Sequence, residues 1–462
     1  MASTSMHGAK TQVLLLSAIC FCCPGLFNAL SSFASGLQDP TMAFAGNVLI
    51  YVCFTVSGIV ASAFVGALGV PKAVMLGTLG YVLYAMALWN LQTRVLAQST
   101  ELFYAACVCL GISAGLLWTA QGQMIMSYAT NENQGRYLSV FWIIFNLGAT
   151  SGGLLTFLLN YNVGNDSTRH VSNATFAAFV LVMAMGTLLC LWLVDSSKVV
   201  KENNERVHEE PANKALPGSR WKAVHELTSF VAKSRTLWLL FPFFVYSNWF
   251  YTYHAFYNVS VFNARASGLA SAFYWAAQMV AAHKLGQYLD RSTGSAISSI
   301  RTAKRVLWVL AFGWNAMWLC GWYTQREALH LSYEQPLGLD VSFQDTNWIG
   351  PTLLYIVYGA GDALGQVWIY WYLSAVCPNG SNVQVAGYHA GLYKSIQALS
   401  AALSWYLGAI QVDPLRQLNI NWVLSNVALA GAVMSVVLIA RQEERSLPMG
   451  RGSQSYESIS LS

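Results

Sequence analysis

Residues 43–68 read AFAGNVLIYVCFTVSGIVASAFVGAL and carry no charged side chain. A helix needs about 20 mainly apolar residues to cross the hydrocarbon core of a bilayer, so this run predicts a transmembrane helix. Eleven further runs follow the same rule: 11–34, 72–92, 101–126, 136–160, 174–195, 236–260, 266–288, 303–325, 350–374, 385–409 and 419–440. Barrel strands are much shorter and alternate in polarity. The pattern therefore predicts an all-α membrane protein with twelve transmembrane helices.

The composition supports a lipid environment. Of the 462 residues, 55% are hydrophobic and only 10% are charged, whereas soluble domains carry about 25% charged residues. A soluble protein this apolar could not cover its surface with polar groups, so the expected partner is the lipid bilayer. The net charge of +5 is spread over the loops without a basic stripe, which argues against nucleic-acid binding. We expect no metal or cofactor.

The basic residues predict the orientation of the chain. Cytoplasmic loops carry an excess of Lys and Arg. If the N-terminus is cytoplasmic, 19 of the 25 Lys and Arg residues fall on the inside and five on the outside. Both termini are therefore predicted to be cytoplasmic, and we expect the plasma membrane rather than an internal membrane.

The longest internal gap divides the chain into two halves. Residues 196–235 are polar and include Pro211, Pro217 and Gly218. We predict a six-helix bundle over 1–195, a cytoplasmic linker over 196–235, a second six-helix bundle over 236–440 and a disordered cytoplasmic tail over 441–462.

One loop motif resembles a known superfamily. Gly286-Gln-Tyr-Leu-Asp290-Arg291-Ser-Thr-Gly294 is similar to the Gly-x-x-x-Asp-Arg-x-x-Gly loop of the major facilitator superfamily, which also has six plus six helices. In a gating latch, Asp290 would accept from a helix N-terminus while Arg291 pairs with a neighbouring helix. The alternative is an ordinary turn with two charges.

The N-terminal half resembles the Unc-ninety-three-like branch of that superfamily, in particular its fungal members. The matching stretches are Pro24-Gly-Leu-Phe-Asn28-Ala-Leu, Gly115-Leu-Leu-Trp118-Thr-Ala-Gln121-Gly122, Gly135-Arg136-Tyr137 and Phe141-Trp142-Ile-Ile-Phe145-Asn146-Leu-Gly148. The resemblance implies the fold. It leaves the function open, because some animal members act as trafficking chaperones or channel regulators.

Two charges lie inside predicted spans. Asp362 occupies the run 350–374 and Lys394 the run 385–409. Ionisable residues at membrane depth are costly and mark functional sites. At 1.5 Å per residue they lie about 18 Å and about 22 Å from the outer ends of neighbouring helices. Asp362 and Lys394 therefore either pair along a central cavity, where a solute or a proton competes for one partner, or form a structural pair.

Neutral polar and aromatic residues complete the candidate site. In this type of fold, the first, fourth, seventh and tenth helices line the cavity. Ten of the 17 residues from Phe241 to Tyr257 are aromatic, which indicates either an aromatic-lined pocket or aromatic helix packing. The candidates for the substrate or ion pathway, besides the two charges, are Asn28, Trp118, Gln121, Asn146, Asn248 and Gln366.

Three sequons predict a glycoprotein. Asn165-Asp-Ser167 and Asn173-Ala-Thr175 fall in the outer loop after the fifth helix, and Asn258-Val-Ser260 falls at the outer end of the seventh. Glycans are added on that side of the membrane.

These observations predict a secondary transporter of a small organic solute that works by alternating access, with possible coupling to protons. The alternative is a non-transporting trafficking chaperone or channel regulator, which would have a protein partner. An enzyme is not expected, because Gly111-Ile-Ser113-Ala-Gly115 lies inside a helix and lacks the preceding strand of a nucleophile elbow. No phosphate-binding glycine-rich loop is present for ATP-driven transport.

Overall fold

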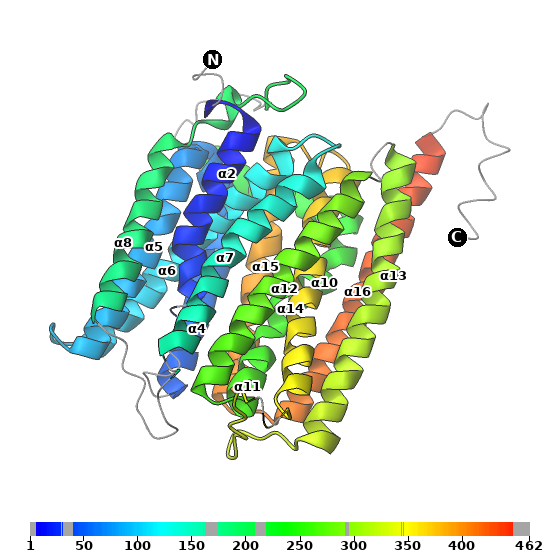
Figure 1. The fold of residues 1–462 in the computed structure, drawn as a ribbon. Coiled ribbons are helices and arrows are strands. Elements are labelled where there is room, and N and C mark those ends of the chain that lie inside the picture. The colour runs from blue at the N-terminus through cyan, green and yellow to red at the C-terminus, as the bar shows by residue number, and fades with distance from the viewer. Residues whose placement is uncertain are drawn as a thin grey trace.

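The computed structural model describes residues 6–28, 30, 40–159, 161, 173–207, 219–291, 295–342, 344 and 346–446. Within these residues the chain is a helical bundle (Figure 1). The N-terminal half contains α2 (Ala9–Cys20), which continues as η1 (Phe21–Gly25), then α4 (Pro40–Leu68), α5 (Val70–Thr93), α6 (Ser99–Tyr128), α7 (Gln134–Leu159), α8 (Asn173–Leu189) and η2 (Cys190–Trp192).

The C-terminal half follows two short linker elements, η3 (Ser196–Lys198) and α9 (Ser219–Lys233). It contains α10 (Arg235–Trp249), α11 (Tyr251–Val261), α12 (Ala264–Arg291), α13 (Ala296–Tyr323), η4 (Thr324–Ala328), α14 (Ile349–Trp371), η5 (Tyr372–Val376), α15 (Val383–Ala409) and α16 (Pro414–Ser446). Each predicted span thus has a helical counterpart, with α10 and α11 sharing the seventh.

Seven helical segments in the described residues are long and apolar enough to cross a membrane. They are the six segments of the N-terminal half and α16. Of the other five predicted spans, the seventh is divided into α10 and α11, each too short to cross a membrane alone, and α12, α13, α14 and α15 contain several tyrosine and tryptophan residues, which hydropathy scales rate as polar. The polarity of the bundle is therefore concentrated in the C-terminal half.

Figure 1 shows the helices of the two halves side by side, with α2 beginning and α16 ending at the same end of the bundle. We call this end the terminal face and the opposite end, where α11 meets α12, the far face. One turn is tight. Gly69 connects α4 to α5 with φ +79°, a left-handed conformation that glycine adopts without strain.

Part of the predicted linker packs against the N-terminal half as an ordered segment. Val199 and Val207 are buried, and the backbone of Val200 pairs with His7 and Ala9. The Glu202 carboxylate accepts hydrogen bonds from Asn133 at 2.9 Å and from Tyr137 at 3.3 Å. Residues 196–207 thus belong with the N-terminal bundle. At the other end of the chain, α16 extends to Ser446, beyond the predicted boundary at 440.

The seventh span is broken rather than continuous. The α10 helix ends at Trp249 and α11 begins at Tyr251. Ser247 donates to the carbonyl of Phe243 at 2.7 Å, a local bond that bends helices. The break exposes the carbonyl of Trp249, which accepts a hydrogen bond from Ser404 of α15 at 2.5 Å. Broken spans occur where backbone lines a binding site.

Two helix pairs join the halves through small residues. Along α7 and α12, Gly135 lies against Gly286 near the terminal face, and Gly153 lies against Gly268 and Ala272 toward the far face. Along α4 and α15, Gly58 faces Ser395 and Gly408 faces Phe44. Small residues let helix backbones approach closely in membranes. The two halves are therefore in contact at both ends of the bundle.

The close packing of α7 against α12 generates a prediction about two glycines. A Cβ atom at Gly153 would lie 2.7 Å from the Ala272 nitrogen and 2.9 Å from the Gly268 oxygen. We expect Gly153→Ala to destabilise the protein by about 1–3 kcal/mol through overpacking. The control is Gly313→Ala on α13, where nothing lies within 4 Å of the added atom, so improved helix propensity should make it neutral or stabilising by about 0.5–1 kcal/mol. Thermal unfolding in detergent measures the stability of both variants. Equal shifts in melting temperature would contradict close packing of α7 against α12 at Gly153.

Candidate functional site

Asp362 lies on α14 and is 4% exposed. Four donors surround its carboxylate: Tyr251 at 2.7 Å, Gln278 at 2.9 Å and Tyr274 at 3.4 Å on Oδ2, and Gln366 at 2.8 Å on Oδ1. Tyr251 is the first residue after the break in the seventh span, so that break places a hydroxyl beside the carboxylate. The charge is thus compensated by neutral hydroxyl and amide groups, which is how a buried charge is tolerated.

Lys394 lies on α15 and is also 4% exposed. Its ammonium group donates to Gln397 Oε1 at 2.8 Å. Three aromatic rings surround the same group, with Nζ 4.7 Å from the centre of Trp118, 5.1 Å from Tyr393 and 5.4 Å from Tyr370. Cation–π attraction is strongest where the cation is desolvated. The ammonium group has three donors, and one of them is used by a hydrogen bond among the described residues.

The predicted direct pair between Asp362 and Lys394 is wrong. The ion pairs among the described residues are Arg265–Asp340 and Arg326–Glu327. Two glutamines connect the charges instead. Gln366 contacts Asp362, Gln397 contacts Lys394, and Gln397 Nε2 donates to Gln366 Oε1 at 3.2 Å. Helical rise along α14 and α15 predicted similar depths for the two charges, but it contains no information about which residues separate them.

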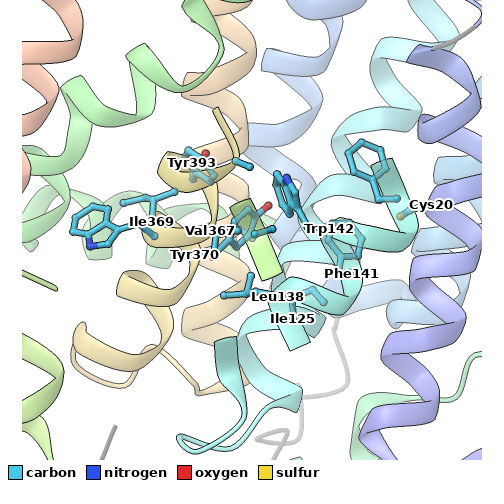
Figure 2. Packing of buried hydrophobic residues seen from close by; sticks show 14 of the residues in the cluster. Cys20, Ile125, Leu138, Phe141, Trp142, Val367, Ile369, Tyr370 and Tyr393 are labelled. Carbon is cyan, nitrogen blue, oxygen red and sulfur yellow. The ribbon is translucent and has the colours of Figure 1, made fainter. Parts of the chain in front are cut away.

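Gln278 of α12 extends this network into the N-terminal half. Its Oε1 accepts from Trp142 at 3.2 Å and from Asn146 at 3.3 Å, both on α7. Figure 2 shows Trp142 and Tyr370 close to each other in the packed interior, with ring centres 6.3 Å apart. Sequence analysis did not single out Gln278, although a glutamine inside a predicted span is a detectable signal.

Two unpartnered atoms lie beside the network. Gln121 accepts from Tyr370 at 3.0 Å through Oε1, while its Nε2 is buried without a hydrogen-bond partner in the structure. Asn146 donates to Gln278, while its Oδ1 is likewise unpartnered. Buried polar atoms are nearly always hydrogen-bonded, so an orphan needs an explanation. One donor and one acceptor are therefore available on side chains that contact Tyr370 and Gln278, which in turn contact Lys394 and Asp362.

The remaining predicted site residues have different positions. Gln366 and Trp118 belong to the network, as described. Asn248 is half-buried on α10 and has no side-chain hydrogen bond among the described residues. Asn28 lies at the end of the span Ala9–Asn28. Most of the aromatic run in the seventh span packs within the C-terminal half, as in Phe243 against Trp314 and Trp368, while Tyr251 contacts the site.

Asp290 lies at the terminal face and contacts the other half of the molecule. Its carboxylate accepts from the backbone N–H groups of Gly135 and Arg136 at the start of α7, both at 2.7 Å. This is the helix-terminus contact expected of a latch. Partial burial raises the pKa of Asp290 to about 6, although these N–H groups and Arg136 lower it. Arg291 is exposed and forms no ion pair among the described residues, so the second contact of the predicted latch is missing.

A second contact between the halves lies at the far face. Arg265, at the start of α12, binds the Asp340 carboxylate through Nε at 3.0 Å and Nη2 at 2.6 Å. It also donates to the carbonyl of Tyr161 at 3.3 Å, and its guanidinium lies 5.4 Å from that ring centre. Tyr161 follows α7 in the N-terminal half. No sequence motif indicates this contact, because Arg265 and Asp340 are distant in the chain.

The sequons differ in accessibility. Asn173 is exposed at the start of α8, where its Oδ1 accepts from Trp89 at 3.1 Å. Asn258 is 8% exposed, and its Nδ2 donates to Ser271 at 2.9 Å. A glycan on Asn258 would require this helix contact to open. Asn165 lies outside the described residues.

Comparisons with known proteins agree with this fold. The family model of the Major Facilitator Superfamily matches residues 13–404. The chain is 31% identical over 442 residues to UNC93-like protein 1 of Arabidopsis thaliana, covering 94% of this chain and 91% of that protein. It is 31% identical over 425 residues to a UNC93-like protein of Schizosaccharomyces pombe, covering 91% and 81%.

A solved structure shows the same architecture. The fucose:proton symporter of Escherichia coli aligns with a TM-score of 0.60 and 13% identity, covering 92% of this chain and 98% of that one. The fold is therefore that of multi-pass membrane transporters. The chain belongs to the Major Facilitator Superfamily and to its UNC93-like branch.

The network predicts a large effect of removing Gln278. Gln278→Leu would leave Trp142 and Asn146 without their acceptor and would remove one donor from Asp362. Each buried polar group left unpaired costs about 1–3 kcal/mol, so we expect destabilisation of about 2 kcal/mol or more. The control is Gln287→Leu on the same helix, where the side chain is exposed and contacts His283. Thermal unfolding compares them. Equal effects would show that Gln278 is not a structural link.

Proposed function

We propose that this protein is a secondary carrier of a small polar organic solute, and that the solute binds among Asp362, Lys394, Gln121 and Asn146. The observation that carries the proposal is the separation of the two buried charges by neutral amides, with an unpartnered polar atom one residue away from each charge. A structural ion pair would place its charges in contact, because attraction between them offsets the cost of burial. Here the charges are held apart.

The chemistry of the site favours a polar solute with both donors and acceptors. The Lys394 ammonium and the Gln121 amide can donate, whereas the Asp362 carboxylate and the Asn146 carbonyl can accept. The rings of Trp118, Tyr370 and Tyr393 provide apolar faces around the ammonium group. Ligand sites commonly combine aromatic walls with a few convergent polar groups.

Alternating access follows from the position of the site between the halves. Trp118, Gln121 and Asn146 come from the N-terminal half, whereas Asp362 and Lys394 come from the C-terminal half. Transporters of this superfamily work by rocking two halves around a fixed midplane site. The contacts of Asp290 and Arg265 with the N-terminal half act in the proposal as gates at the two faces. Asp362 is the proposed proton carrier, because it is the acidic residue in the network.

The test is solute-driven proton uptake by the purified full-length protein in vesicles that contain a pH-sensitive dye. A panel of sugars, amino acids, nucleosides and carboxylic acids is added outside. We expect one class to acidify the interior, and we expect Asp362→Asn to reduce this acidification at least about tenfold, the scale on which loss of one proton-transfer group acts. Asparagine keeps an acceptor oxygen for the three donors on Oδ2, and an unchanged size-exclusion profile shows that the variant folds.

The matched control is Asp413→Asn, which removes an exposed carboxylate that accepts from the backbone of Arg416. It should transport like the unmodified protein. Uptake of a solute without acidification, unaffected by Asp362→Asn, would contradict proton coupling through Asp362. Absence of flux across the whole panel, together with a copurifying channel or receptor, would favour the regulatory alternative.

A further inference from the structure

A polar cavity lies at the terminal face, away from Asp362 and Lys394. It has a volume of about 600 Å³ and is bounded by α9, the start of α10, the segment before α15 and the end of α16. Four basic side chains line it, namely Lys233, Arg235, Arg441 and Arg445, and no carboxylate is among its lining residues. None of the four forms an ion pair or a side-chain hydrogen bond among the described residues.

The start of α10 adds further positive potential to this cavity. Ser234 caps the helix by accepting from the backbone of Leu237 at 3.3 Å, and Ser234, Arg235 and Thr236 all line the cavity. The first N–H groups of a helix have no partner within the helix, and the helix dipole favours an anion there. The cavity therefore combines four cations with an anion-favouring helix end.

A buried histidine gives an independent indication of a ligand. His389 of α15 lines the cavity and is 3% exposed. Its Nδ1 has no hydrogen-bond partner in the structure. Phe230 of α9 packs against His389, and the centres of the two rings are 5.6 Å apart. His389 therefore lines the cavity and has one ring nitrogen that a hydroxyl of a ligand could satisfy, because buried polar atoms are nearly always hydrogen-bonded.

The cavity lies at the ends of two predicted membrane spans. Its basic residues flank the predicted spans 236–260 and 419–440 at the face that the charge distribution predicts to be cytoplasmic. The general excess of cations at that face does not explain the cavity, because Arg301, Lys304 and Arg305 of α13 belong to the same predicted face and do not line it. Basic pockets between transmembrane helices on the cytoplasmic side bind phosphorylated headgroups.

We propose that this cavity binds a phosphate-bearing anion. The phosphate group contacts Arg235, Arg441 and Arg445 and the N–H groups at the start of α10, while His389 Nδ1 binds a hydroxyl or phosphate oxygen deeper inside. The same chemistry is found in the headgroup of an anionic phospholipid and in a soluble phosphate ester. Binding would join α10, α15 and α16 at the terminal face.

The experiment measures binding of a fluorescent short-chain phosphoinositide to the purified full-length protein in detergent. We expect Arg235→Gln/Arg441→Gln/Arg445→Gln to weaken binding at least about tenfold, because each basic residue contributes to attraction of an anionic headgroup. His389→Phe, which keeps a ring of similar size, should weaken binding about threefold, the loss expected for one hydrogen bond.

The control removes three cations from the same face and leaves the cavity intact. Arg301→Gln/Lys304→Gln/Arg305→Gln should bind within about twofold of the unmodified protein. Equal weakening in both triple variants would overturn the proposal, since binding would then follow total charge. The proposal would also be overturned if the unmodified protein bound the lipid no more tightly than the cavity variant, Arg235→Gln/Arg441→Gln/Arg445→Gln.

Two further arms identify the source of the ligand. Inositol trisphosphate and inorganic phosphate are each tested as competitors of the fluorescent lipid. Competition by inositol trisphosphate at a similar concentration to the lipid supports a cavity that recognises the phosphate ester alone. If neither soluble anion competes with the lipid, and the cavity variant no longer binds the lipid, the ligand is a membrane lipid.

Discussion

The structure depends on a carboxylate that is buried far from water without a cation in contact with it. Asp362 is surrounded by hydroxyl and amide donors from α11, α12 and its own helix. An isolated charge in a medium of low polarity is very costly, so these donors must be held in place. The break before Tyr251, the polar face of α12 and the position of Gln366 one turn after Asp362 all serve this requirement.

The same requirement links the halves. Gln278 faces Asp362 with its amide nitrogen and faces Trp142 and Asn146 with its oxygen. The α12 helix therefore contacts the N-terminal half at its centre as well as at both ends, through Arg265 at the far face and Asp290 at the terminal face. Buried hydrogen bonds of this kind are strong where little water is present, so they favour one arrangement of the helices that they join. A movement that opens one face changes contacts at the centre.

Much of the fold could be predicted from the sequence because the bilayer demands long apolar runs. Each of the twelve predicted runs overlaps a helix or, for the seventh, two helices. The stretches that resemble the family also contain Trp118, Gln121 and Asn146, the residues of the N-terminal half that contact the network. The break at Phe250 was missed, since aromatic residues there are compatible with a continuous helix and the bond from Ser404 that satisfies Trp249 comes from a distant segment.

The contacts within the site could not be predicted, because they depend on how the helices pack against one another. Spacing along α14 and α15 set the depth of Asp362 and Lys394, but the rotation of each helix and the reach of Gln366 and Gln397 decide whether the charges touch. The contact of Asp290 with the start of α7 followed from a motif, whereas the contact of Arg265 with Asp340 has no local pattern. Tertiary packing alone brings those residues together.

The central claim is that the halves open alternately at the two faces around the network of Asp362. The most direct measurement is pulsed electron resonance between spin-label pairs at exposed positions, Glu132 with Gln287 at the terminal face and Leu158 with Gln335 at the far face. The account predicts conformations in which one distance lengthens while the other stays short, with their populations shifting when a transported solute is added. A single fixed distance for both pairs under every condition, or lengthening of both together, would contradict it.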